Sequence, residues 1–291
     1  MDAKNSLPKQ YIKGKFDWPG DDVLKQYFSL PSNIIYYMVM NPSTPKCYNK
    51  LIQCCKHFFE RNPIIVVKNL IFYDCDEPFE SQTKICPLRE CECQHFGCCV
   101  HIDIYKFINK FWLTSELEFD FSTTSEFGPG FSSNNNPNYI STLCSKIFQC
   151  DIVKLELEEK VIYYEDFKLL ALSAKEILLD DVEVIYNKED DDDNVMLEKI
   201  LEACPKVKKF TYVFGGRVYT STSETIKNIE KLKDFEQNIF CFVCYRIPEI
   251  FKVEDLSNFI KNHEFVSIQL HFDSGISNEY ENQLDALIDT Q

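Results

Sequence analysis

Apolar residues in the second half of the chain follow two alternating spacings, one typical of helices and the other typical of strands. Apolar positions three and four residues apart predict helices at residues 139–148, 167–170, 197–204, 224–235, 254–262 and 280–288. Short apolar runs between these segments predict strands at residues 153–157, 177–179, 207–213, 239–245 and 265–272. The chain is therefore expected to have an α/β fold.

The predicted helices and strands alternate regularly along the second half of the chain. The strand centres are expected near Leu155, Ile177, Phe210, Phe240 and Ile268, which are 22, 33, 30 and 28 residues apart. Units of this length predict an irregular β–α solenoid over residues 139–291, in which stacking buries the apolar face of each unit. The alternative is a single α/β domain whose parallel strands are joined by helices without true repetition.

The middle of the chain, residues 63–138, is less regular. The apolar run at residues 64–73 predicts a buried strand or two, and the alternation at residues 117–121 predicts a half-buried strand. Residues 74–101 form a polar insertion that is dense in cysteine. Residues 122–138 are rich in Ser, Asn, Gly and Pro, which predicts a loop.

Residues 30–63 predict two short amphipathic helices joined by a turn. Pro31 suits the first turn of the first helix, Thr44 is the expected N-cap of the second, and Asn62-Pro63 is expected to end it. The apolar positions of the second helix are Cys47, Tyr48, Leu51, Ile52, Cys55, Phe58 and Phe59. Two helices this short cannot bury both apolar faces against each other, so part of that surface has to meet the rest of the chain or a partner protein.

This segment resembles an F-box. The resemblance is carried by Leu30-Pro31, by the apolar ladder of Ile34, Ile35 and Met38, and by the closing residues Cys55-Lys56-His57-Phe58-Phe59. The segment departs from the family pattern at residues 41–45, which contain two prolines where an aspartate-leucine step is usual. The whole chain looks most like the nematode type, with a weak N-terminal F-box and a leucine-rich-repeat-like tail. Residues 197–212 resemble the helix–Cys-Pro–strand step of such repeats.

The resemblance implies a short helical F-box-like hairpin followed by a leucine-rich-repeat-like solenoid. The expected organisation is an N-terminal leader (1–27), the F-box-like motif (28–62), a strand and loop region (63–138) that contains the Cys-rich insertion (74–101), and the αβ repeat region (139–291).

The resemblance also implies a non-enzymatic role in ubiquitin-dependent degradation. F-box proteins dock on a Skp-type adaptor of a cullin ubiquitin ligase and capture a protein substrate through their repeats. The residues expected to form the adaptor interface, or the hairpin core beneath it, are Leu30, Pro31, Ile34, Ile35, Met38, Leu51 and Ile52. The alternatives are a standalone protein-binding scaffold without a ubiquitin-ligase role and a zinc-binding module.

Composition narrows the possible partners and compartments. The formal net charge is −15, which repels nucleic acid phosphates, and no basic patch offsets it. The longest apolar runs are far shorter than a membrane-spanning helix. The first ten residues lack the apolar core of a signal peptide, so the protein is expected in the cytosol or the nucleus, with its 14 cysteines as free thiols.

The zinc alternative rests on a cluster of possible ligands within residues 86–101. The cluster contains Cys86, Cys91, Cys93, Cys98, Cys99, His95 and His101. Zinc takes four thiolate or imidazole ligands, and this segment offers seven, although without the paired C-x2-C spacing of common zinc sites. A surface insertion with no metal is the other interpretation, and no other cofactor is predicted.

Other chemical motifs favour structural roles. Cys241 and Cys244 are three residues apart in a predicted strand, so they are expected on opposite faces and not as shared metal ligands. The acidic run at residues 189–193 lacks the spacing of a calcium-binding loop and is expected to be solvated. No G-x-S-x-G, H-E-x-x-H or P-loop motif occurs in the sequence, and the chain is not expected to be an enzyme.

Overall fold

The computed structural model describes residues 29–73, 82–86, 100–120, 138–186, 194–215, 220–232 and 235–288. The chain divides into two compact units, Met1–Pro42 and Ser43–Gln291. The first contains helix α1 (Ser32–Met40), and the second contains the other helices and the strands. The boundary falls within the segment 28–62 that was expected to form one hairpin.

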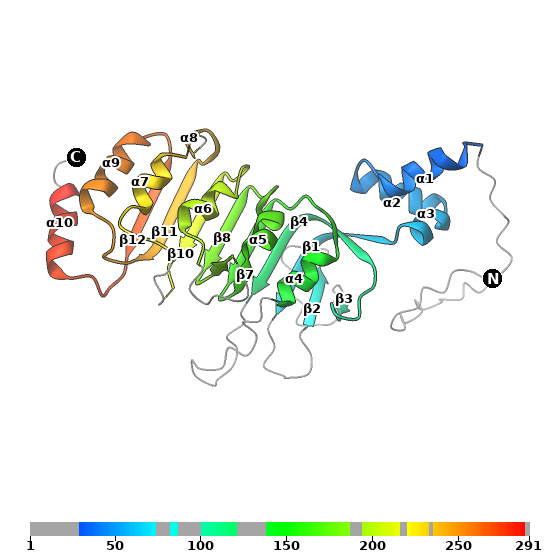
Figure 1. Cartoon of the computed structure of the whole chain (residues 1–291), viewed down its shortest axis with the longest axis horizontal. Coiled ribbons are helices and arrows are strands. Elements are labelled where there is room, and N and C mark those ends of the chain that lie inside the picture. The colour runs from blue at the N-terminus through cyan, green and yellow to red at the C-terminus, as the bar shows by residue number, and fades with distance from the viewer. Residues whose placement is uncertain are drawn as a thin grey trace, which may run out of the picture. The chain divides into compact units, whose positions relative to one another are not determined.

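The second unit is a mixed α/β fold built on a mostly parallel sheet (Figure 1). Its strands are β1 (Ile64–Tyr73), β2 (Gln82–Cys86), β3 (Val100–Ile102), β4 (Lys110–Asp120), β5 (Ile147–Cys150), β6 (Lys154–Glu158), β8 (Glu176–Asp180), β10 (Lys209–Val213), β11 (Cys241–Ile247) and β12 (Ser267–Phe272). The order across the sheet is β12-β11-β10-β8-β6-β4-β1-β2-β3, and β5 pairs with β4. β2 pairs antiparallel with both β1 and β3. The remaining neighbours along this order, from β1 to β12, pair parallel. Short strands β7 (Val161–Tyr163) and β9 (Glu183–Ile185) form a separate parallel pair.

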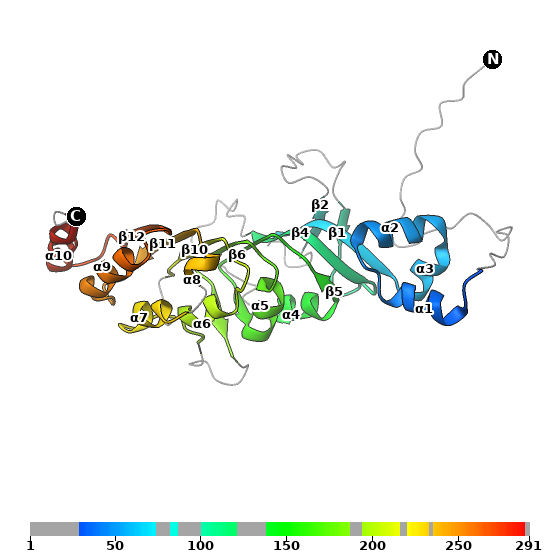
Figure 2. The same ribbon diagram turned by 90° about the horizontal axis from the view of Figure 1, so that it is seen from above.

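The helices of the second unit lie before the first strand, between strands of the sheet and after the last strand. They are α2 (Pro45–Cys54), α3 (Lys56–Arg61), α4 (Asn138–Ser145), α5 (Tyr164–Ala171), α6 (Leu197–Glu202), α7 (Thr225–Glu230), α8 (Phe235–Asn238), α9 (Val253–Asn262) and α10 (Asn278–Ile288). Figure 2 shows α4, α5, α6, α7 and α9 along one face of the sheet. We call these five helices the helical layer. None of the helices in the described ranges is long and apolar enough to cross a membrane.

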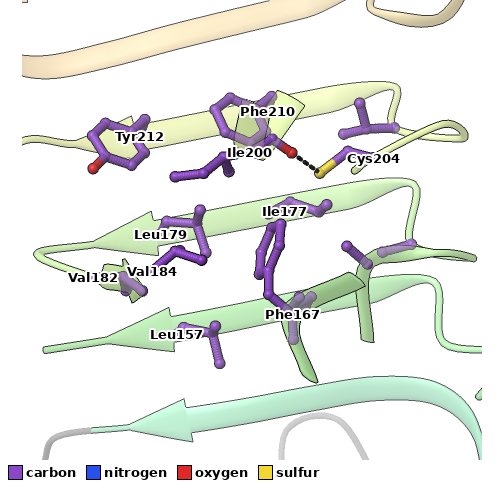
Figure 3. Close-up of a cluster of buried hydrophobic side chains, with 14 of the residues drawn as sticks. Leu157, Phe167, Ile177, Leu179, Val182, Val184, Ile200, Cys204, Phe210 and Tyr212 are labelled. Atoms are coloured by element: carbon purple, nitrogen blue, oxygen red, sulfur yellow. Dashed lines mark hydrogen bonds between the residues drawn. The ribbon is translucent and has the colours of Figure 1, made fainter. Parts of the chain in front are cut away.

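The strands present matching rows of buried side chains to the helical layer. One row consists of Leu155, Ile177, Phe210 and Phe242, and the next consists of Leu157, Leu179, Tyr212 and Cys244. Residues directly opposite in register fall in the same row, so each strand continues the apolar surface of its neighbour. Phe167 of α5 and Ile200 of α6 belong to the same core, as Figure 3 shows. Burial of these rows joins the helical layer to the sheet.

Successive strands begin with the same backbone arrangement. The Val153 carbonyl accepts hydrogen bonds from the N–H groups of Lys175 and Glu176, at 2.7 and 3.0 Å. The Lys175 carbonyl accepts in the same way from residues 208 and 209, and the Lys208 carbonyl accepts from residues 240 and 241. Each strand–helix unit is therefore placed on the preceding one by equivalent contacts.

The register corrects one expected strand centre. Phe242, and not Phe240, lies opposite Phe210, and Phe240 precedes β11 with 60% of its surface exposed. The aligned positions Leu155, Ile177, Phe210, Phe242 and Ile268 are 22, 33, 32 and 26 residues apart. The error arose because Ile239 and Phe240 extend the apolar run two residues ahead of the start of β11 at Cys241.

The helix expected after Thr44 is divided into two. It begins as predicted, since Oγ1 of Thr44 accepts a hydrogen bond from the Cys47 N–H at 3.1 Å and Pro45 lies in the first turn. Cys55 then has an extended backbone (φ −155°, ψ 124°) between α2 and α3. The expectation of one helix through Phe59 is wrong, because the apolar spacing continues across the interruption and no Pro or Gly marks it.

Two further segments differ from expectation in the same unit. Residues 147–148 were expected in a helix with residues 139–144, but they belong to β5, where Ile147 pairs with Phe111. The helix expected at residues 224–235 is represented by the separate helices α7 and α8. The strand predicted at residues 64–73 is confirmed as β1.

Tyr48 joins α2 to the start of β1. Its side chain is buried, and the hydroxyl donates a hydrogen bond to the Asn62 carbonyl at 2.6 Å and accepts one from the Ile64 N–H at 3.0 Å. Burial raises the pKa of Tyr48, and the hydrogen bond from Ile64 partly opposes that rise. Ile64 and Trp112 pack with Tyr48 in a small apolar cluster.

Replacing Tyr48 with phenylalanine is expected to lower the free energy of unfolding by about 1–3 kcal/mol, because buried backbone groups lose a hydrogen-bond partner. Urea denaturation measures this change. Tyr37→Phe is the matched control, since Tyr37 is 65% exposed, and its effect is expected to stay within about 0.5 kcal/mol. Equal losses in the two variants would contradict the structural role of the Tyr48 hydroxyl.

Candidate functional site

The side of the sheet opposite the helical layer is the main candidate for binding. β6 and β8 alternate between fully buried side chains that face the helical layer and more exposed side chains that face the other way. We call the latter side, from Glu116 of β4 to β12, the open face. At the start of β1 and β4, α2 packs on the same side of the sheet through the cluster of Tyr48, Ile64 and Trp112.

The half of the open face on β4, β6 and β8 is rich in carboxylates. Its acidic side chains are Glu116, Glu118, Glu156, Glu158, Glu176 and Asp180. Lys154 lies among them and forms an ion pair with Glu156. Negative charge therefore dominates this half.

Register separates two kinds of charged row on the open face. In the first row the signs alternate, because Lys154 has Glu116 and Glu176 as its neighbours on the adjacent strands. In the next two rows like charges are neighbours, with Glu118 opposite Glu156, and Glu158 opposite Asp180. Each of these two pairs contains one carboxylate that is ion-paired with a basic side chain, Glu156 with Lys154 and Asp180 with Arg246.

The half of the open face on β10, β11 and β12 is mixed, with the exposed polar side chains Lys209, Ser267 and Gln269 at one end and an aromatic pair at the other. Val213 and Tyr245 lie opposite each other on β10 and β11, and the Tyr245 ring stacks on His271 with centroids 4.5 Å apart and an interplanar angle of 9°. Tyr245 is 38% exposed, so its ring remains accessible to a partner. The aromatic end of this half presents a surface suited to an apolar or aromatic side chain.

An arginine connects the two halves. Arg246 of β11 forms an ion pair with Asp180 of β8, which lies two strands away. The Arg246 backbone has φ 53°, a left-handed conformation that is uncommon for non-glycine residues, and the pairing of β11 with β12 is irregular at this point. The side chain therefore spans β10 along the row that contains Val213.

The residues predicted for adaptor docking differ in their exposure to solvent. Leu30, Pro31 and Ile34 are exposed, with Leu30 at 49% and Ile34 at 45%, whereas Ile35 is buried and Met38 is half-buried. Leu30 precedes α1, Pro31 is its N-cap, and the Pro31 carbonyl accepts hydrogen bonds from the N–H groups at positions 34 and 35, at 3.0 and 3.1 Å. α1 therefore exposes apolar side chains to a potential partner.

The predicted docking residues of the second helix have a different environment. Leu51 and Ile52 of α2 are both half-buried. Ile52 packs against the cluster of Tyr48, Ile64 and Trp112, which places it in the hydrophobic core of the second unit.

The proposed zinc ligands fall largely beyond the described part of the chain. Cys91, Cys93, His95, Cys98 and Cys99 lie outside the described residues. The backbones of Cys86 and His101 belong to β2 and β3, but the placement of their side chains is not described either. Elsewhere in the described ranges, no three His, Cys, Asp or Glu side chains come together in a way that could hold a metal ion. The zinc site stays a prediction, and the acidic run at residues 189–193 is also outside the described residues.

The buried cysteines are suited to packing. Cys144 and Cys204 are buried in the core of the helical layer, as the apolar spacing of their segments predicted, whereas Cys55 is half-buried at the helix interruption. Burial raises the pKa of the Cys144 and Cys204 thiols, so both stay protonated and weakly nucleophilic at neutral pH. Cys241 and Cys244 lie on opposite faces of β11, with Cys244 buried, as predicted.

Sequence reasoning did not select the open-face residues. The alternation within residues 154–158 indicates a two-sided strand, but it does not identify which residues lie opposite Glu156 or Glu158. That information comes from the register between strands that are far apart in the sequence. Comparison of the chain with protein-family models and with curated proteins finds no match.

Proposed function

We propose that this chain is a non-enzymatic substrate-recognition adaptor of a Skp–cullin–F-box type ubiquitin ligase, acting in the cytosol or the nucleus. In this proposal the N-terminal helices bind the Skp-type adaptor, and the sheet of the second unit binds a protein substrate. The helix–strand units form an irregular, leucine-rich-repeat-like solenoid.

One observation carries the substrate-binding part. The helical layer covers one face of a parallel sheet whose strands follow one another in chain order from β4 to β12, apart from the short β5 and the separate β7–β9 pair. The recurring carbonyl contacts of Val153, Lys175 and Lys208 support the interpretation that these units stack as a solenoid. Such stacking leaves a continuous sheet face, and its half-exposed side chains are available to a macromolecule.

The adaptor-binding part is supported by α1. Ile34 of this nine-residue helix and Leu30, which precedes it, are about half exposed and present apolar surface that water solvates poorly. Tyr37 follows Ile34 by three residues and adds an exposed ring to the same side of the helix. A partner that covers these side chains would gain hydrophobic free energy.

A standalone scaffold is the alternative, in which the open face binds protein and α1 has no adaptor partner. Binding of a purified Skp-type adaptor to the full chain separates the two possibilities. The wild-type protein is expected to bind, and Ile34→Asp is expected to weaken binding at least tenfold, about 1.4 kcal/mol, because the carboxylate would be buried without a partner. Isothermal titration calorimetry measures both affinities.

Tyr36→Asp is the matched control for this experiment. Tyr36 is 62% exposed and lies roughly 200° around the helix from Ile34, so the same charge is added on the other side of α1. Ile35 is unsuitable for the test because it is buried and its replacement would disturb folding. A folded wild-type chain that does not bind the adaptor would exclude the ubiquitin-ligase role and favour the scaffold.

A further inference from the structure

We propose that the edge of the sheet at which its parallel strands begin binds an extended acidic protein segment. In that segment an Asp or Glu has an aromatic or large apolar side chain about two residues away on each side. The binding surface consists of Val153, Lys175, Lys208 and Phe240, which lie at the starts of β6, β8, β10 and β11, and we call it the basic edge. The proposed function assigns partner binding to α1 and to the open face, so the basic edge is a further binding surface.

The four residues of the basic edge follow one another on neighbouring strands. The Val153 carbonyl accepts a hydrogen bond from the Lys175 N–H at 2.7 Å, the Lys175 carbonyl accepts one from the Lys208 N–H at 2.7 Å, and the Lys208 carbonyl accepts one from the Phe240 N–H at 2.9 Å. Each residue is therefore roughly one strand interval, or 4.8 Å, from the next. Lys175 is 33 positions before Lys208, so the sequence alone shows no basic patch here.

The two lysines of the basic edge are adjacent cations without a carboxylate partner. Lys175 is exposed and Lys208 is half-buried, and neither forms an ion pair within the described ranges. The Lys208 ammonium lies 5.0 Å from the centroid of the Phe240 ring, a contact that does not neutralise its charge. Lys206, in the turn before Lys208, is also exposed and without an ion pair in these ranges. A carboxylate can therefore contact both lysines of the basic edge as their counter-ion.

The acidic side chains beside the basic edge have neighbours of their own. Glu176 follows Lys175, and in register it has a lysine on each side, Lys154 and Lys209. Asp151, near the other end of the edge, accepts a hydrogen bond from the Trp112 indole N–H at 2.7 Å. The starts of β8 and β10 therefore carry more positive than negative charge, although the formal net charge of the chain is −15.

Exposed apolar side chains lie on both sides of the two lysines. Val153 is 41% exposed on the β6 side, and Phe240 is 60% exposed on the β11 side. Both can contact an aromatic or aliphatic side chain of a ligand. The net charge of −15 opposes the approach of a long polyanion such as a nucleic acid, whereas a short acidic segment with apolar flanks gains contacts to all four residues.

The strand spacing sets the spacing of the ligand. From the midpoint between Lys175 and Lys208 to Val153 or to Phe240 is one and a half strand intervals, or roughly 7 Å. An extended chain that crosses the strands advances roughly 3.3 Å per residue. A ligand whose carboxylate contacts both lysines would therefore place a side chain at each apolar residue about two positions before and after it.

A random dodecapeptide library displayed on phage tests the proposal, with the purified full chain as the target. The expected result is enrichment of peptides in which Asp or Glu has an aromatic or large apolar residue about two positions away on each side. The most enriched peptide, synthesised with a fluorescent label, is expected to bind at least fivefold more weakly to Lys175→Gln/Lys208→Gln and to Phe240→Ala than to the wild-type chain. Fluorescence anisotropy measures these affinities.

The double variant Lys46→Gln/Lys50→Gln is the matched control. Both lysines are exposed on α2, and their neutralisation changes the net charge by the same amount as the basic-edge double variant. Its affinity for the peptide is expected to equal that of the wild type. Thermal unfolding establishes that each variant is folded before its affinity is compared.

Several results would overturn the inference. They are the absence of selective enrichment, enrichment of basic or uncharged peptides, and equal loss of affinity in the basic-edge and control double variants. Tighter binding of a labelled single-stranded DNA dodecamer than of the peptide would also overturn it, and would assign the edge to nucleic acid. The adaptor experiment is independent of these results, because it depends on α1 and on a purified adaptor. Peptide binding without adaptor binding would leave this inference intact and remove the ligase role, and the reverse result would do the opposite.

Discussion

Replacing Phe210 with alanine is expected to lower the free energy of unfolding by about 3–5 kcal/mol. Phe210 is fully buried at the centre of a row of core side chains, where its ring stacks on Phe242 with centroids 6.0 Å apart and an interplanar angle of 8°. The row joins β8, β10 and β11, so the cavity left by alanine would lie between three strands and the helical layer. Urea denaturation followed by circular dichroism measures the loss.

Phe240→Ala is the control that tests the register. Phe240 is 60% exposed, and its ring lies beneath the Lys208 ammonium at 5.0 Å. Its replacement is expected to cost less than about 1 kcal/mol. If Phe240→Ala proved as destabilising as Phe210→Ala, Phe240 would be the core residue of its strand and the register of β10 with β11 would be wrong.

Much of the second unit could be predicted from the apolar pattern. The apolar spacing identifies the strands around Leu155, Ile177 and Phe210 and the helices between them. Each of these elements buries one face, and that face determines the periodicity of its apolar residues. The N-cap at Thr44 was also predictable, since its oxygen satisfies a backbone donor within three residues. These features depend on local sequence.

Features that depend on distant contacts were missed. Cys55 interrupts a continuous apolar spacing, and the hydrogen bond that the Tyr48 hydroxyl donates to the Asn62 carbonyl cannot be predicted from that spacing. Ile147 has apolar neighbours at helical spacing, yet it pairs as a strand with Phe111, 36 positions earlier. The spacing of apolar residues cannot distinguish a helix from a strand in such short segments, because either element would bury the same side chains.

The candidate site was predictable only in part. The apolar residues of α1 were selected from the sequence, and the exposure of Leu30 and Ile34 distinguishes surface positions from the buried Ile35. The acidic rows of the open face were not selected, because Glu158 and Asp180 become neighbours only through strand pairing across a helix and a turn. Overall acidity was evident from composition, but its arrangement was not.

The stability of the second unit is expected to fall steeply as the pH rises above about 9. Burial raises the pKa of the Cys144, Cys204 and Cys244 thiols above their ordinary value of 9.0, and it raises the pKa of Cys150 to about 11. Above that pH the unfolded chain releases the four thiol protons while the folded chain retains them, so the folded state binds more protons and the free energy of unfolding decreases with pH. At pH 9 each thiol of the unfolded chain is half ionised, so each of the four contributes a loss of about 1 kcal/mol between pH 9 and pH 10, or about 4 kcal/mol together.

Buried tyrosines extend this loss to higher pH. Burial raises the pKa of Tyr212 and of Tyr280 to about 12, from an ordinary value of 10.0. Their contribution to the free energy of unfolding is complete below pH 10 and is lost as the pH rises towards 12. The tyrosines therefore steepen the fall of stability with pH only above the pH at which the unfolded thiols begin to ionise. Urea denaturation at several pH values between 7.5 and 10.5, with a reducing agent present, measures the combined slope.

Two alanine variants identify the thiols as the cause. Cys204 is buried and its Sγ lies 3.1 Å from the Ile200 carbonyl, so Cys204→Ala removes one of the four thiols and is expected to reduce the slope between pH 9 and pH 10 by about one quarter. Cys54→Ala removes an exposed thiol and is the control for the loss of a cysteine side chain. The slope is the decisive quantity, because the cavity left by Cys204→Ala lowers stability by a similar amount at every pH. A Cys204→Ala slope equal to that of the wild type would show that alkaline unfolding has another origin.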